Sequence, residues 1–328
     1  MKPLLLLVPA LILAALVNDP YVTNLLVVCA IFALPAIGLS LLMGYTGQIS
    51  LGHAAFVAIG AYVSTLFEQH SGLSPWLGML LATAASALAA WSVGWLVFRL
   101  RGHHLAMATL ALGMIVHTVL VEWQPVTGGQ DGLGNIAVLG AFGIELFDDL
   151  RFYPLAWLAC IAGLVLAHNL VRSPTGLAMR TVGESDAVAA SLGIDAARVK
   201  RRVMALSGAY AGLGGALYAH WMGYISPDPF HVGFSIKLLL IVALGGFTGV
   251  WNVLAGTFFV VIVSEWLKPL GRFDVVIYGA LLVLAMIHCR DGLFASLARI
   301  AGKALPARRH AVHKTSERAM DIAKETSA

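Results

Sequence analysis

Residues 172–202, RSPTGLAMRTVGESDAVAASLGIDAARVKRR, form a polar island between two long apolar blocks. Its centre has the pattern of a short amphipathic helix that ends at Gly193. Such an interruption is typical of a surface loop that offers a docking element to a soluble partner. Its basic residues are Arg172, Arg180, Arg198, Lys200, Arg201 and Arg202.

The composition on either side of the island indicates a membrane protein. Hydrophobic residues make up 59% of the 328 residues, charged residues make up 12%, and the mean hydropathy is +0.84. A water-soluble domain of this length carries far more charge. We therefore expect an integral membrane protein.

The apolar runs give the number of membrane spans. A hydrocarbon core of about 30 Å needs about 20 apolar residues per helix. Residues 18–20 offer no small-residue cleavage site, so the first run is interpreted as a helix and not as a signal peptide. The fold class expected is all-α and polytopic, with a transmembrane domain at 1–292 and a basic cytoplasmic tail at 293–328. About ten spans are predicted, at 4–17, 21–43, 49–67, 75–98, 104–123, 153–171, 203–222, 234–247, 249–268 and 275–289.

The distribution of charge predicts the orientation. With both termini in the cytoplasm, every one of the 21 Lys and Arg residues lies on the inner side except Arg151, Lys237, Lys268 and Arg272. This is a strong positive-inside pattern. The net charge of +4 is thereby explained by topology, and a nucleic-acid partner is not expected.

Two glycine-rich segments are predicted to interrupt the helices. The first, 44–53, lies between the second and third spans, and the second, 245–252, lies near the end of the eighth. An interrupted helix at membrane depth must satisfy its backbone through protein or a watery path. Both segments are therefore candidates for a substrate path, and tight turns at the inner surface explain them equally well. The candidate path residues are Gly44, Tyr45, Gly47, Gln48, Ser50, Gly52, His53, Gly245, Gly246 and Thr248.

A search for catalytic chemistry leaves transport as the function class. The chain contains no Gly-x-x-x-x-Gly-Lys-Ser/Thr phosphate loop, and no nucleophile or metal-ligand constellation emerges. Small residues gather in the runs 81–90 and 212–219, as expected where transmembrane helices pack closely. We expect a passive pathway that is powered by a partner, with no cofactor bound by this chain.

Three stretches resemble the membrane permeases of bacterial ABC importers for branched-chain amino acids, and within them the M-type subunit. They are GYTGQISLGHAAFVAIGAYVSTL at 44–66, the run from GESDAVAASLGID to ISPDPF at 183–230, and GGFTGVWNVLAG at 245–256. The resemblance implies a multi-pass protein of the bacterial inner membrane that carries a small neutral amino acid. The implied partners are a second, homologous permease, two cytosolic ATPase subunits that hold ATP and Mg²⁺, a periplasmic binding protein and membrane lipid.

The resemblance also implies a coupling helix within the island. Such importers carry Glu-Ala-Ala with a Gly four residues after the second Ala. Here Val188, Ala189 and Gly193 occupy that frame, and Ala187 stands where the motif has Glu. The residues implied to contact the ATPase are Glu184, Ser185, Asp186, Ala189, Ala190, Gly193 and Ile194.

Two alternatives stay open. The first is a urea or short-amide ABC permease, because an uncharged path suits urea as well as a small zwitterion. The second is a secondary transporter or channel that needs no ATPase. A coupled secondary carrier predicts internal repeats and buried charges, which the sequence does not display.

Overall fold

The computed structural model describes residues 19–98, 100, 103–141, 144–145, 148–246, 249–267 and 274–288. The predicted first span, 4–17, and the predicted tail, 293–328, lie outside this part of the chain. The long helices are α2 (Pro20–Ser40), α3 (His53–Ser71), α4 (Pro75–Val97), α5 (His103–Glu122), α7 (Asp149–Arg172), α10 (Ala196–Met222), α11 (Val232–Gly245), α12 (Asn252–Leu267) and α13 (Asp274–His288). The short elements are η1 (Leu41–Tyr45), α6 (Gln124–Thr127), η2 (Gly129–Asp131), α8 (Pro174–Glu184), α9 (Asp186–Ser191) and η3 (Asp228–Phe230).

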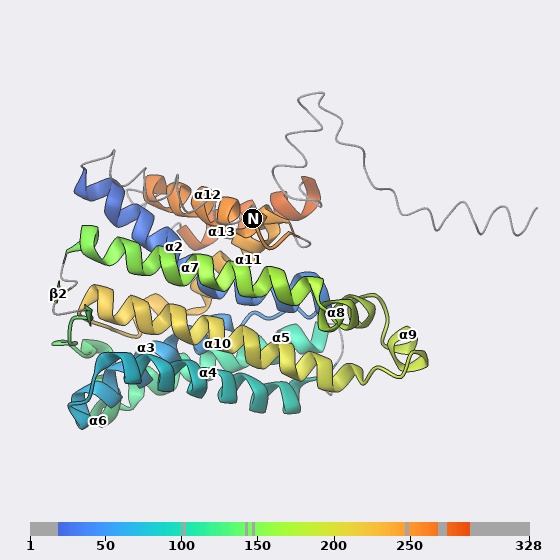
Figure 1. Cartoon of the computed structure of the whole chain (residues 1–328), viewed down its shortest axis with the longest axis horizontal. Coiled ribbons are helices and arrows are strands. Elements are labelled where there is room, and N and C mark those ends of the chain that lie inside the picture. The colour runs from blue at the N-terminus through green and yellow to red at the C-terminus, as the bar shows by residue number, and fades with distance from the viewer. Residues whose placement is uncertain are drawn as a thin grey trace, which may run out of the picture.

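Most of the long helices, among them α4, α7 and α10, lie side by side along the long axis of the molecule (Figure 1). The strands β1 (Gly140–Ala141) and β2 (Ile144–Glu145) form an antiparallel pair at one end. We call this the hairpin end, and the opposite end, where α8 and α9 lie, the α8 end. Successive long helices run in opposite directions between the two ends. The all-helical prediction is therefore confirmed apart from this two-residue pairing.

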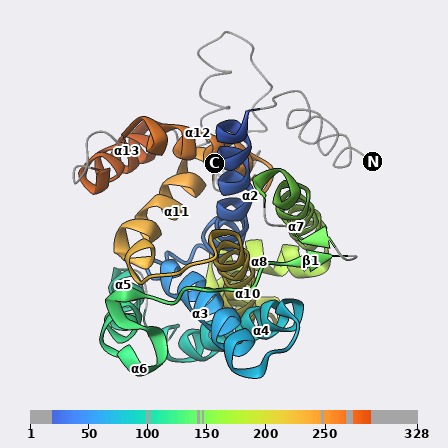
Figure 2. The same ribbon diagram turned by 90° about the vertical axis from the view of Figure 1, so that its left-hand side faces the viewer.

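Helix α10 occupies the centre of the bundle and packs against α4, α3 and α2 (Figure 2). Its small residues allow this close packing. A Cβ at Gly212 would lie 2.5 Å from the Ser86 side chain, and a Cβ at Gly60 would collide with the Gly212 backbone. Close backbone approach supplies dispersion contacts in lipid, where the hydrophobic drive between helices is absent. The predicted role of the small-residue runs 81–90 and 212–219 in close packing is confirmed where α10 contacts α4.

Four helical segments of the described chain are long and apolar enough to cross a membrane: Pro20–Tyr45, Pro75–Val97, His104–Glu122 and Asp149–Arg172. Two shorter apolar helices are Val232–Gly245 and Asn252–Leu267. The predicted spans 49–67 and 203–222 correspond to α3 and α10, which are rich in small and polar residues because they face other helices. The structure thus contains a helix for each predicted span from the second to the tenth, while the number that crosses a membrane stays a prediction.

Several predicted boundaries differ from the structure by a few residues, and two of them lie near the island and the glycine-rich segment 44–53. The third span was placed from residue 49, but α3 begins at His53, since Leu51 and Gly52 lie in the turn against Thr109 of α5. The seventh span was placed from residue 203, but α10 begins at Ala196. Asp195 caps it there, because its Oδ1 accepts a hydrogen bond from the Arg198 amide at 2.9 Å. The last residues of the island therefore belong to a bundle helix.

Candidate functional site: the island and the two broken turns

The island folds into two short helices. Helix α8 starts at Pro174 behind Ser173, whose hydroxyl accepts from the Gly176 amide at 3.4 Å. Gly176, Met179 and Val182 form its buried face. Ser185 is extended, with φ of −164°, and separates α8 from α9. The sequence pattern predicted one short helix here, and the structure contains two because Ser185 leaves the helical conformation.

Gly193 ends α9, as the sequence predicted. It has a φ of +75°, its amide donates to the Ala190 carbonyl at 3.0 Å, and the Ile194 amide donates to the Ala189 carbonyl at 2.9 Å. These two bonds form a Schellman motif, which needs a left-handed residue at the position of Gly193. A Cβ at Gly193 would meet nothing within 4 Å. The requirement for glycine is therefore one of backbone conformation and not of space.

The exposed face of α9 is apolar. Val188 is 48% exposed and Leu192 is 65% exposed, whereas Ala189 is fully buried against the protein. We call this surface the α9 patch. Glu184 and Gly193 are exposed beside it, and Ser185, Asp186 and Ile194 are partly buried. The members of the α9 patch are Ala187, Val188, Ala190, Ser191 and Leu192.

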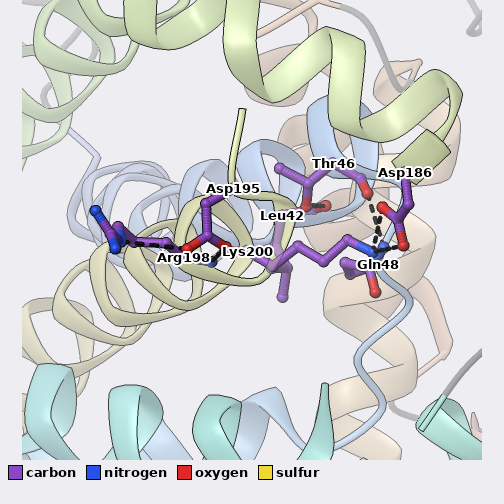
Figure 3. A network of polar contacts seen from close by, with 7 residues as sticks. All are labelled: Leu42, Thr46, Gln48, Asp186, Asp195, Arg198 and Lys200. Atoms are coloured by element: carbon purple, nitrogen blue, oxygen red, sulfur yellow. Dashed lines mark hydrogen bonds and ion pairs between the residues drawn. The ribbon is translucent and has the colours of Figure 1, made fainter. Parts of the chain in front are cut away.

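An ion pair joins α9 to α10. Lys200 Nζ lies 2.8 Å from Asp186 Oδ1 and 2.9 Å from Oδ2, and the Lys200 side chain is only 13% exposed. Figure 3 shows the pair beside Gln48. Gln48 belongs to the glycine-rich segment 44–53, which we call the first broken turn, and the segment 245–252 is the second. A pocket of about 460 Å³ lies here, lined by Gln48, Phe98 and island residues that include Glu184 and Asp186. The Asp186–Lys200 pair therefore connects the first turn of α9 with the second turn of the central helix.

The first broken turn follows a π-helical ending of α2. The Thr46 hydroxyl donates to the Leu42 carbonyl at 2.6 Å, and the Gln48 side-chain amide donates to the Thr46 carbonyl at 2.8 Å (Figure 3). Gly47 has a φ of +67°. The predicted interruption is confirmed, and the polar side chains of its first half satisfy its own backbone.

Helix α8 rests directly on this turn. A Cβ at Gly183 would lie 2.5 Å from the Tyr45 carbonyl oxygen, so only glycine permits this approach. The Arg180 guanidinium lies 5.6 Å from the centroid of the Tyr45 ring, within the range of a cation–π interaction. Two contacts therefore join the island to the end of α2.

Ser50, Gly52 and His53, in the second half of the turn, are buried among other helices. The Leu51 amide donates to Thr109 of α5 at 3.0 Å, and His53 Nε2 lies 3.1 Å from the Ser207 hydroxyl of α10. Ser50 is 1% exposed and His53 is fully buried. The Ser50 hydroxyl and His53 Nδ1 have no hydrogen-bond partner within the described residues. Two buried polar atoms thus remain available to a solute or to water.

The second broken turn lies next to the first. Gly245 ends α11, Gly246 has a φ of +89°, and the Tyr45 hydroxyl is within hydrogen-bonding reach of the Val250 backbone. A Cβ at Gly245 would lie 2.7 Å from the Asn252 carbonyl oxygen. Thr248, a predicted path residue, lies outside the described residues. The structure therefore brings both broken turns and the island together at the α8 end.

The sequence pattern did not identify four residues that connect the island, the first broken turn and α10. They are Gly183, Arg180, Lys200 and Ser207. Gly183, Arg180 and Lys200 lie inside the island, so their position was visible. The partner of Gly183 and Arg180 was not visible, because Tyr45 lies far away in the sequence, and the pairing of Lys200 with Asp186 depends on how the chain folds back at Gly193. Ser207 is one of many small polar residues in spans, and nothing local distinguishes it.

The bundle of apolar helices and the basic island at one end of it are typical of a helical membrane protein. The sequence profile of one family, described as "Branched-chain amino acid transport system / permease component", matches residues 21–286. The chain belongs to this permease family, which confirms the resemblance seen in the sequence.

Individual relatives agree with this assignment. The chain is 31% identical over 286 residues to the high-affinity branched-chain amino acid transport system permease protein LivM of Salmonella typhimurium, covering 80% of this chain and 67% of the relative. The Escherichia coli LivM protein matches with the same identity and coverage. The guanosine ABC transporter permease protein NupQ of Bacillus subtilis is 29% identical over 193 residues, which cover 53% of this chain and 59% of NupQ. No solved structure matches the chain.

Proposed function

We propose that the chain is the M-type permease subunit of an ABC importer in the bacterial inner membrane, and that it forms half of the pathway for branched-chain or other neutral amino acids. The observation that carries the proposal is the family match over 21–286 together with an exposed apolar helix, α9, in the basic island. The other half of the pathway is a homologous permease. Two cytosolic ATPase subunits bind ATP and Mg²⁺, and a periplasmic protein delivers the substrate.

The charges at the two ends support an orientation with the α8 end in the cytoplasm. The α8 end carries the six basic residues of the island. Among the described residues, the hairpin end carries the basic residues Arg151 and Lys237 and a larger group of acidic residues, Asp19, Asp131, Asp148, Asp149 and Asp228. Basic residues are retained on the cytoplasmic side of membrane proteins. With about ten spans, both termini lie in the cytoplasm.

The coupling route starts at the α9 patch. An ATPase subunit that binds Val188 and Leu192 moves α9, and the Asp186–Lys200 pair transmits the movement to α10. The contact of Gly183 with Tyr45 transmits it from α8 to the two broken turns. The turns then control access to the path. Glu184, Ser185, Ala190 and Ile194 are the neighbouring contact residues.

The substrate class rests on the relatives and on the neutral lining of the turns. The LivM proteins named above transport branched-chain amino acids, and their match covers more of this chain than the nucleoside permease does. We keep a urea or short-amide substrate as the alternative. Membrane lipid surrounds the apolar helices.

An affinity purification tests the importer class. The tagged chain is extracted from its native membrane in mild detergent, and co-purifying proteins are identified by mass spectrometry. We expect a homologous permease and ATPase subunits with the wild-type chain. Leu192→Asp, which places a charge in the α9 patch, is expected to lose the ATPase subunits and keep the second permease. Thr175→Asp is the matched control, because it places the same charge at an exposed position of α8 outside the α9 patch, and it should keep the ATPase subunits.

A different outcome would contradict the importer class. A chain that purifies alone and supports uptake in vesicles without ATP is a secondary carrier or a channel, and the proposal is then wrong. Equal recovery of the ATPase with Leu192→Asp would leave the importer class in place and remove α9 as the docking helix.

A further inference from the structure

An apolar hollow lies within the bundle, away from the island and the broken turns. It has a volume of about 170 Å³ and is formed between α2, α3, α10, η3, α11 and α13. In the end-on view α2, α3, α10 and α11 are neighbours (Figure 2), and η3 and α13 contact α11. Its lining includes Phe32, Tyr218, Phe230, Phe234, Lys237 and Tyr278.

The walls of the hollow are held in place by aromatic packing. The Phe32 and Phe234 rings meet edge to face with centroids 5.0 Å apart, and Tyr218 meets Phe230 in the same way at 6.1 Å. Phe230 and Phe234 are almost completely buried. Edge-to-face pairs of this kind are among the favourable aromatic geometries. The hollow is therefore a preformed cavity with a defined shape.

The size of the hollow limits its occupant. A cavity of about 150 Å³ lined by apolar side chains holds one benzene molecule. The present volume of about 170 Å³ therefore admits one apolar group of that size, such as the side chain of leucine, isoleucine or valine. It does not admit a second ring system of comparable size.

The hollow contains a cation on an otherwise apolar helix. Lys237 lies in α11, its Nζ is 4.9 Å from the centroid of the Tyr278 ring, and its side chain is partly exposed. An ionisable residue in a membrane helix is costly and marks a functional site by default. The uncapped first turn of α11 faces the same hollow through Gly233, so its dipole adds positive potential.

We infer that this hollow is the substrate contact site of the permease, where the aromatic walls receive the apolar side chain of an amino acid and Lys237 binds its carboxylate. The inference rests on the proposed function and adds to it a place and a chemical selectivity. Urea and short amides lack both a carboxylate and an apolar side chain, so this site discriminates against them.

The test uses the complete transporter reconstituted in proteoliposomes with its binding protein and ATP. Uptake of leucine, valine and alanine is measured for Phe234→Trp, which reduces the volume, and for Phe234→Leu, which enlarges it. Phe234→Trp should lower leucine uptake relative to alanine about tenfold, since one methylene in an apolar pocket changes selectivity by at least that much. Phe234→Leu should change the preference in the opposite direction. Phe259→Trp, on a partly exposed face of α12, is the matched control and should keep the wild-type preference.

The role of the cation has its own pair of variants. Lys237→Met should raise KM for leucine about tenfold, because a hydrogen bond to a charged group is worth about 1.5 kcal/mol or more. Lys237→Arg should retain most of the affinity. Arg151→Met, an exposed cation of the hairpin end, should leave KM unchanged.

Different results would contradict the proposed function and the inference about the hollow. If the wild-type transporter shows no ATP-dependent uptake of amino acids, the proposed function is wrong and this inference with it. If the wild type is active and neither Phe234 variant changes the preference among the three amino acids, only the inference is wrong. Loss of a co-purified phospholipid from Phe234→Trp, with an unchanged preference, would assign the hollow to a lipid chain and would also overturn it.

Discussion

At the scale of the residue, Gly193 shows how one backbone angle defines a functional surface. Its φ of +75° allows the Schellman ending of α9, and its surroundings are open. A left-handed conformation costs about 1–2 kcal/mol for a residue with a Cβ, least for Asn and most for a β-branched residue. The effect of a substitution at Gly193 is thus confined to the orientation of α9.

We predict that Gly193→Val uncouples ATP hydrolysis from uptake while the protein still inserts. The measurement is the ratio of substrate uptake to ATPase activity in proteoliposomes, which should fall several-fold. Gly193→Asn is the matched control and should retain most of the coupling, because Asn tolerates the left-handed region. Normal coupling with valine at this position would count against α9 as the coupling helix.

A substitution of Ser50 distinguishes a structural role of the segment 44–53 from a role in the substrate path. Its buried hydroxyl has no partner within the described residues. Because an unpaired buried hydroxyl does not stabilise the fold, we predict that Ser50→Ala leaves the melting temperature unchanged or raises it slightly, yet lowers uptake. Gln48→Leu should also reduce uptake more than ATPase binding.

Ser86→Ala is the control for this experiment. The Ser86 hydroxyl is equally buried but donates to the Phe56 carbonyl at 3.0 Å. Its loss should cost about 1 kcal/mol of stability. If Ser50→Ala leaves both stability and uptake at the wild-type level, the segment 44–53 is a structural turn and no part of the path.

At the scale of the element, the connection between α9 and α10 depends on one ion pair. The Asp186–Lys200 pair is partly buried, at 2.8 Å, and joins two helices that are separated by the Gly193 turn. Partial burial reduces solvent screening, so the pair should contribute more to helix orientation than an exposed pair does.

We predict that Lys200→Glu impairs coupling, because it places two carboxylates in contact. The double variant Asp186→Lys with Lys200→Glu should recover a substantial part of the coupling, which is measured as uptake per ATP hydrolysed. Arg198→Glu, which faces the exposed Asp195 instead, is the comparison and should have a small effect. A double variant as defective as the single one would show that the pair does not transmit the movement.

At the scale of the whole molecule, the orientation in the membrane is open to direct measurement. We predict that a cysteine at position 192 is labelled by an impermeant thiol reagent only from the cytoplasmic side. A cysteine at position 148 should be labelled only from the opposite side. Cys29 and Cys160 are buried, so replacement of Cys289 provides a suitable background. Labelling of both positions from one side would refute the arrangement with both termini in the cytoplasm.

Composition and pattern determined the helical class, the positions of the helices and the basic island. Apolar runs with small residues admit one regular structure in lipid, since a helix satisfies its own backbone. Gly193 and the break after Tyr45 were also visible, because a glycine that ends a helix acts locally. The family relationship could be inferred from the three stretches that carry it, and the match over 21–286 confirms it.

Only the tertiary structure decided which segments meet. The contact of Gly183 with Tyr45, the Asp186–Lys200 pair and the hollow beside Lys237 each join positions that lie far apart or across a turn. The division of the island at Ser185 and the start of α10 at Ala196 were also decided there. A hydropathy pattern records which face of a helix is apolar, but it carries no information about which neighbour that face will contact. For this reason the sequence determined the helices, and their packing determined the site.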